Sequence, residues 1–121
     1  MHPFRTAVES GDVDAAVRLF AEDVEFRSPA VYQPHRGREA AARLVHGVAR
    51  VFEDFRYVSE IGEPDGRDHA LVFRARVGDR EIEGCDLLHE NEDGAIAEFT
   101  VMVRPLSGLL ALAEAMRAQL R

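Results

Sequence analysis

One acidic side chain stands in the middle of an otherwise apolar stretch of the sequence. The stretch EIEGCDLLHE, residues 81–90, is typical of a β-strand, and Asp86 lies inside it. Moving a carboxylate out of water is costly, so an acid in an apolar place keeps its proton to a higher pH unless a cation pairs with it. A neutral carboxylic acid can donate a hydrogen bond to a carbonyl or hydroxyl oxygen. Asp86 is therefore the first candidate for a catalytic acid.

Two tight turns predict which way Asp86 points. We expect Gly78-Asp79 and Asp93-Gly94 to close hairpins, and counting back from each turn gives the opposing residues. One face then collects the pairs Leu71/Asp86, Phe73/Gly84, Ala75/Ile82, Asp86/Val101, Gly84/Val103 and Leu88/Phe99. The other face collects the opposite charges Arg74/Glu83 and Arg76/Glu81, which is the sorting expected of a correct register. Asp86 is thus predicted to share its face with apolar side chains.

This placement allows two interpretations of Asp86. In the first, the acid faces a ligand and donates a hydrogen bond to it. In the second, it bonds to a loop backbone or to a tyrosine such as Tyr32 or Tyr57 and only stabilises the fold. The sequence leaves both open.

The surrounding elements follow from hydrophobic periodicity. Residues 3–10 and 13–21 are predicted as two short helices, with Gly11 ending the first and Asp12 capping the second. A short strand covers residues 24–28, a loop runs to Arg36, and a helix begins at Gly37. The remainder is mostly strand until a terminal helix, whose apolar stripe consists of Leu109, Ala113, Met116 and Leu120. Helices on one face of a mostly antiparallel sheet make an α+β fold, and we expect residues 1–121 to form a single domain.

Composition excludes several classes of function. The chain has 121 residues, 46% of them hydrophobic, which suffices for one core. Its 15 basic and 22 acidic residues give a formal charge of -7, so we expect neither nucleic acid nor membrane partners. The single cysteine, Cys85, excludes an internal disulfide. No two histidines have metal-ligand spacing on one predicted element, so we expect no metal and no cofactor. Without a secretion signal, we expect a soluble cytoplasmic protein.

Three longer segments resemble a known family. These are SGDVDAAVRLFAEDVEF, HRGREAA and GCDLLHENEDGAIAEFTVMVRP, which together span nearly the whole chain. They are similar to the SnoaL-like branch of the nuclear transport factor 2 superfamily, which also holds ketosteroid isomerases, limonene epoxide hydrolase and polyketide cyclases. The resemblance implies a cystatin-like, cone-shaped curved sheet, mixed or antiparallel, with helices on its concave face. It also implies a cavity for a small hydrophobic ligand.

The resemblance does not carry over a complete mechanism. Ketosteroid isomerases hold a protonated aspartic acid beside a tyrosine and use a second aspartate to move the proton. Asp86 matches the protonated acid, but Phe4 stands at the tyrosine position and Ser28 at the base position. We therefore expect no dienone isomerisation by that mechanism. The last strand offers only apolar residues inward, so the polar mechanisms of the cyclases and the epoxide hydrolase do not transfer either.

By the same analogy, the loop YQPHRG lies near the mouth of the cone. His35 and Tyr32 are then the candidates for a second polar group in the pocket, although both also fit a solvated or packed loop. Ser28 points inward with Phe26 by strand alternation and can bond a ligand oxygen or the local turn. The predicted apolar lining consists of Phe26, Phe52, Phe73, Leu88, Phe99, Val101 and Val103.

We therefore predict a domain that binds a small hydrophobic, oxygen-bearing molecule. If it is an enzyme, Asp86 is the acid of an isomerase, cyclase, hydratase or hydrolase type of reaction, completed by His35, Tyr32 or substrate-bound water. The alternative is a non-catalytic binding or dimerisation module with a degenerate site. The outer face of the sheet would expose a second apolar surface, so we expect a homodimer through Val72, Cys85, Leu87 and Met102.

Overall fold

The computed structural model describes residues 1–119, and its framework is one six-stranded sheet with four helices. The helices are α1 (Pro3–Glu9), α2 (Val13–Arg18), α3 (Arg38–Val51) and α4 (Leu106–Gln119). The strands are β1 (Phe20–Arg27), β2 (His35–Arg36), β3 (Glu53–Ile61), β4 (Asp68–Val77), β5 (Arg80–Glu90) and β6 (Ile96–Arg104). Leu120, the last residue of the predicted helical stripe, lies outside the described residues.

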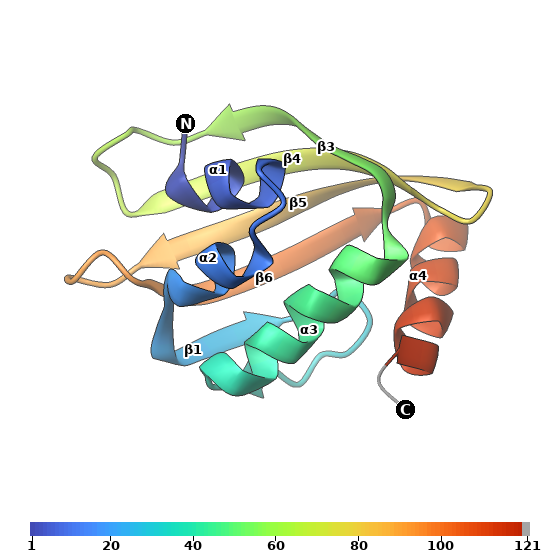
Figure 1. Cartoon of the computed structure of the whole chain (residues 1–121), viewed down its shortest axis with the longest axis horizontal. Coiled ribbons are helices and arrows are strands. Elements are labelled where there is room, and N and C mark those ends of the chain that lie inside the picture. Colours follow the sequence, from blue (N-terminus) through green and yellow to red (C-terminus); the bar gives the residue numbers. More distant parts are fainter. Residues whose placement is uncertain (120–121) are drawn as a thin grey trace.

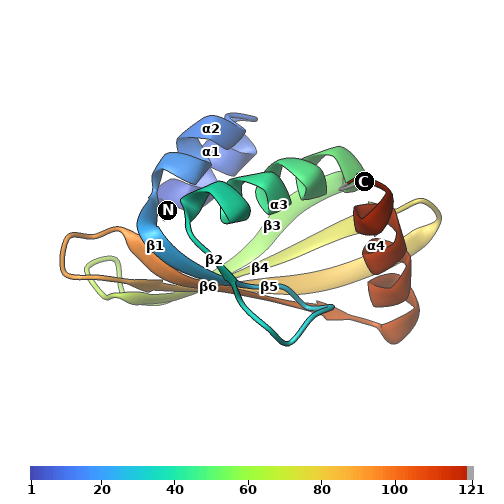
Figure 2. The ribbon, with the colours of Figure 1, turned by 90° about the horizontal axis from the view of Figure 1, so that it is seen from below.

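The sheet is mixed, and the helices gather on one side of it. Its strand order is β2-β1-β6-β5-β4-β3, in which only β1 and β6 run parallel. The sheet curves around α1, α2 and α3, which lie over one face, while α4 closes one end (Figures 1 and 2). Within residues 1–119 no helix covers the opposite face (Figure 2). The predicted α+β fold with helices on the concave face is confirmed.

Both predicted hairpin registers are confirmed. Leu71 lies opposite Asp86 between β4 and β5, and Asp86 lies opposite Val101 between β5 and β6. The alternation of buried and exposed residues along β4 and β5 follows the predicted faces. A bulge after His89 shifts the register near the last turn, but it lies beyond the pairs that place Asp86. The acid therefore belongs to the concave face.

The second helix is shorter than predicted. Its start is as expected, because the Asp12 side chain accepts a hydrogen bond from the backbone N–H of Ala15 at 3.0 Å. It ends at Arg18 and not at residue 21, because the chain enters β1 at Phe20, opposite Ile96. The Arg38 guanidinium donates two hydrogen bonds to the Phe20 carbonyl oxygen, at 3.0 and 2.8 Å. The pairing of β1 with β6 and the hydrogen bonds from Arg38 together outweigh the helix propensity of the residues that follow Arg18.

One glycine allows an aromatic ring to pack flat on the sheet. A Cβ atom at Gly84 would clash with Cζ of Phe73, its cross-strand partner. The Phe73 ring therefore covers the Gly84 backbone and also packs against the rings of Phe55 and Tyr57.

None of the helices in the described part of the chain is both long and apolar enough to cross a lipid bilayer.

Candidate functional site

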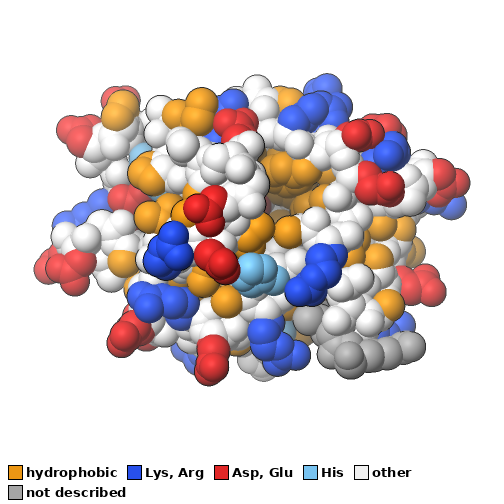
Figure 3. All heavy atoms as spheres, in the orientation of Figure 1, with side chains coloured by type: hydrophobic (Ala, Val, Ile, Leu, Met, Phe, Trp, Pro, Cys, Tyr) orange, Lys and Arg blue, Asp and Glu red, His pale blue; other side chains and the backbone are white. Residues whose placement is uncertain are grey.

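A cavity of about 930 Å³ lies between the concave face and the helices. The face of the molecule in Figure 3 is hollowed near its centre, and hydrophobic side chains surround the hollow. Its walls come from α1, β1, β2, α3, β3, β5, β6 and α4, and they include Phe4, Phe26, Val48, Phe52, Val101 and Leu112. A volume of this size and an apolar wall suit a small hydrophobic ligand.

Asp86 and Tyr57 form a buried polar pair in the wall of this cavity. The Tyr57 hydroxyl donates a hydrogen bond to Oδ2 of Asp86 at 2.9 Å. Both residues line the cavity, and each is only 6% exposed. The pair comes from β3 and β5, which β4 separates. Tyr57 therefore reaches across a neighbouring strand, over a span of about 10 Å that only a long side chain can cover.

Burial keeps Asp86 protonated to unusually high pH. Desolvation raises the pKa of Asp86 from its ordinary value of 3.8 to about 7, although the hydrogen bond from Tyr57 lowers it. Burial and the neighbouring Asp86 charge both raise the pKa of Tyr57 far above its usual range. No salt bridge joins Asp86 to a cation among residues 1–119. Tyr57 thus stays a neutral hydroxyl, and Asp86 titrates near neutral pH.

The number of protons on the pair decides what it can do. When Asp86 is protonated, the pair carries two acidic protons. One of them joins the two side chains, and the other is free to be donated into the cavity. When Asp86 is ionised, the single hydroxyl proton is held by the carboxylate, and no donor is left for a ligand. The protonated pair can therefore bind and polarise a carbonyl oxygen.

The remaining predicted polar residues are divided between the cavity and the solvent. His35 and Ser28 both line the cavity and are half-buried. His35 lies on β2 opposite Phe26, not in a loop as predicted. The Ser28 hydroxyl accepts a hydrogen bond from the backbone N–H of Val31 at 3.3 Å, which is the local turn bond named as its alternative. Glu9, Arg56 and Arg117 add charged groups to the lining.

Tyr32 does not reach the cavity. It is 98% exposed, because the segment between β1 and β2 carries it outward, and it lines only a separate pocket of about 570 Å³. Val103 also lines this second pocket and not the cavity, since it lies near the end of β6 beyond the last residue paired with β1. For Tyr32 the structure therefore supports the alternative of a solvated loop residue, and the prediction that Val103 lines the ligand cavity was wrong.

Two further predicted lining residues are core residues. Phe73 and Leu88 do point to the concave face, but other side chains cover them there, and they are 1% and 2% exposed. Phe73 is covered by the rings of Phe52 and Phe55. Strand parity predicted the face correctly but not the depth at which each side chain lies.

The geometry defines a class of protein: an α+β cone whose concave face and helices enclose an apolar cavity with one polar pair. The family model of the SnoaL-like domain matches residues 2–99 of this chain. The chain belongs to this family, and the resemblance noted in the sequence is confirmed.

Several solved structures share this fold. A steroid delta-isomerase from Pseudomonas aeruginosa is 41% identical, with a TM-score of 0.89 over 95% of this chain and 84% of its own. A protein with a cystatin-like fold from Silicibacter pomeroyi is 39% identical, with a TM-score of 0.90 over 98% and 86%. An NTF2-like protein from Burkholderia xenovorans, 22% identical with a TM-score of 0.66 over 94% and 90%, shares the fold alone. None of the curated proteins matches the chain.

Proposed function

We propose that the cavity binds a small hydrophobic carbonyl compound, whose oxygen accepts a hydrogen bond from the protonated Tyr57–Asp86 pair. The observation that carries this proposal is the pair itself, which is buried in an apolar wall and joined by a 2.9 Å hydrogen bond. A buried pair with a spare proton favours a ligand that brings an acceptor, because the unpaired donor is costly without one. The aromatic and aliphatic walls bind the rest of the ligand by burial of apolar surface.

The chemistry that fits this arrangement is an isomerase type of reaction. Asp86 would stabilise the negative charge that develops on the carbonyl oxygen when a proton leaves the adjacent carbon. His35 would accept that proton on a ring nitrogen and return it to another carbon, so that a double bond moves and no atom is gained or lost. The 41% identity to the steroid delta-isomerase from Pseudomonas aeruginosa supports this type of reaction.

Ser28 favours a second candidate, which is binding without turnover. A hydroxyl cannot accept a carbon-bound proton near neutral pH without a base beside it. The Ser28 oxygen bonds the Val31 backbone, which leaves His35 and the Glu9 carboxylate as the lining groups that can accept a proton. If neither group acts as a base, the cavity binds a carbonyl ligand and releases it unchanged.

A screen of matched ligands tests the role of Asp86. We expect carbonyl-bearing steroid-like, terpenoid and polyketide-like compounds to raise the melting temperature of the wild type at pH 6. We expect a smaller shift from hydrocarbons of the same skeleton, such as limonene compared with carvone. Asp86→Ala should lose at least tenfold in affinity for the carbonyl member and little for the hydrocarbon. If every ligand stabilises both proteins equally, Asp86 does not contribute to binding of the carbonyl group.

The outer sheet face supports a second proposal, a homodimer. Leu87 and Met102 remain 37% and 57% exposed on the face that no helix covers in residues 1–119, and Cys85 on β5 lies directly opposite Met102 on β6. An apolar stripe of this kind is costly in water and is typical of an interface. Two copies packed by these faces would bury it, with the cavities directed away from each other.

Light scattering after size exclusion tests this interface. We expect the wild type to elute with twice the 13.5 kDa mass of one chain. Met102→Glu should give a monomer, because it introduces a charge into the centre of the apolar stripe. Leu106→Glu, which changes an exposed residue of α4, is the matched control and should remain a dimer. A monomeric wild type, or an undisturbed Met102→Glu dimer, would contradict the interface.

A further inference from the structure

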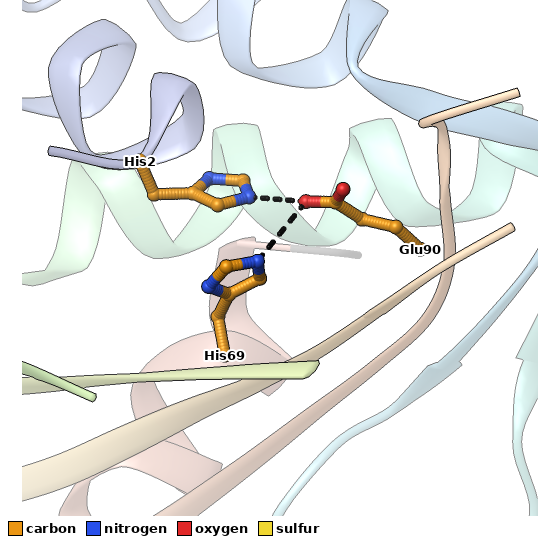
Figure 4. Close-up of side chains that lie close together, drawn as sticks. All are labelled: His2, His69 and Glu90. Atoms are coloured by element: carbon orange, nitrogen blue, oxygen red, sulfur yellow. Dashed lines mark hydrogen bonds and ion pairs between the residues drawn. The ribbon is translucent and has the colours of Figure 1, made fainter. Parts of the chain in front are cut away.

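Two histidines and a carboxylate meet outside the cavity, at the N-terminal edge of α1 (Figure 4). Nε2 of His2 lies 2.6 Å from Oε2 of Glu90, and Nε2 of His69 lies 3.6 Å from the same oxygen. All three ligand atoms lie within 4.8 Å of one another. The side chains come from the turn before α1, from β4 and from the end of β5, and their exposed fractions are 6%, 4% and 19%. No single element carries both histidines, in agreement with the sequence, but the fold brings His2 and His69 together from separate segments.

We propose that His2, His69 and Glu90 form a binding site for a divalent zinc-class ion. Two imidazole nitrogens and one carboxylate oxygen are a ligand set that zinc takes in proteins, with a fourth position left to water. Ligand atoms around a tetrahedral ion with bonds of about 2.0–2.1 Å lie about 3.3 Å apart. The His69–Glu90 distance is already close to this value. The His2–Glu90 distance of 2.6 Å must lengthen by about 0.7 Å to reach it.

The surrounding charges also favour a cation. The Glu60 carboxylate on β3 accepts a hydrogen bond from the backbone N–H of His2 at 2.8 Å. The other oxygen of Glu60 lies 3.5 Å from Nη1 of Arg5 on α1, and the same guanidinium pairs with Glu9 at 3.1 Å. The carboxylates of Glu60 and Glu90 therefore lie beside the histidines, and Arg5 is shared with a third carboxylate. A divalent ion would neutralise this excess of negative charge.

Protons compete with the ion for the same atoms. Nδ1 of His2 accepts a hydrogen bond from the backbone N–H of Phe4 at 3.0 Å, so the proton of the neutral ring is on Nε2, toward Glu90. Nε2 of His69 donates to the Gly66 carbonyl oxygen at 2.8 Å. An ion would displace both Nε2 protons and break the Phe4 bond, a loss of about tenfold in affinity per bond.

The site would stabilise the wall of the cavity without belonging to it. An ion bound there connects the start of α1 to β4 and β5, and α1 contributes Phe4 and Val8 to the cavity lining. None of the three ligands lines the cavity. The role is thus structural, and it is independent of whether Asp86 binds a carbonyl compound.

Calorimetric titration of the untagged full chain with Zn²⁺ at pH 7.5 tests the proposal, with Co²⁺ as a spectroscopic probe. We expect one ion per chain, a micromolar or tighter Kd, and the visible absorption of tetrahedral cobalt. Zinc should also raise the melting temperature, and EDTA should reverse the increase.

Conservative variants keep the test independent of folding. His69→Gln can still donate to Gly66, and Glu90→Gln keeps the size of the side chain, so both should fold and both should lose at least tenfold in affinity. His46→Gln is the matched control, because His46 pairs with Asp14 on the surface at 3.1 Å, and it should bind as the wild type does. Equal zinc affinity of all four proteins, or none in the wild type, would overturn the site.

Discussion

The Asp86→Asn variant is expected to gain stability over the wild type as the pH rises, by on the order of 2–3 kcal/mol between pH 5 and pH 8. The pKa of Asp86 is 3.8 in an ordinary setting and about 7 in the folded protein. Between these values the folded wild type holds one proton more than the unfolded chain. Its free energy of unfolding therefore falls as the pH rises through this window, and the loss is complete above about pH 7. An amide does not titrate, so the variant lacks this loss.

Urea unfolding of both proteins at pH 5, 6, 7 and 8 measures the difference directly. Asp79→Asn serves as the control, because Asp79 lies at a hairpin tip and its side chain is 95% exposed. That substitution should change stability equally at every pH. If the gap between the wild type and Asp86→Asn does not widen with pH, Asp86 is not an acid held protonated by burial.

The second large effect is on ligand affinity. The affinity of the wild type for the tightest-binding carbonyl compound of the screen should fall about tenfold per pH unit above pH 7, which is about 100-fold at pH 9. The reason is the loss of the spare proton when Asp86 ionises. In Asp86→Asn, the side-chain oxygen can still accept from Tyr57 while the amide N–H donates to the ligand. Its affinity should therefore be the same at pH 6 and pH 9.

Calorimetric titrations between pH 6 and pH 9 distinguish binding through the Asp86 proton from binding by hydrophobic contacts alone. A hydrocarbon of the same skeleton controls for changes elsewhere in the protein, and its affinity should not change with pH in either protein. If the wild type binds the carbonyl compound equally well at pH 6 and pH 9, its affinity does not depend on a hydrogen bond from the Asp86 proton to the ligand oxygen.

Strand pairing made Asp86 predictable from the sequence. Two tight turns fixed the registers of β4, β5 and β6, and a slip of one residue would have moved the apolar face into water. The connection from β3 to β4 covers residues 62–67 and is longer than a two-residue turn, and the pairing of these two strands is irregular at two places. The sequence therefore offered Tyr57 only as one of two possible tyrosine partners. Its position near Asp86 depends on the curvature of the sheet and the length of its side chain.

The remaining differences also have physical causes. Alternation along a strand reports a face but not whether helices and rings cover it, so Phe73 and Leu88 were predicted in the lining and lie in the core. The segment between β1 and β2 has no periodicity that would place Tyr32. His2, His69 and Glu90 come from three separate segments, and only the folded sheet brings them together.

The most direct test of the central claim is the titration of the Asp86 carboxyl carbon by ¹³C NMR. We expect a midpoint near pH 7 in the wild type. In Tyr57→Phe the midpoint should move higher, because the hydrogen bond from Tyr57 lowers the pKa of Asp86. A wild-type midpoint near pH 4, or no movement in Tyr57→Phe, would contradict the account of a buried acid that carries its proton into the neutral range.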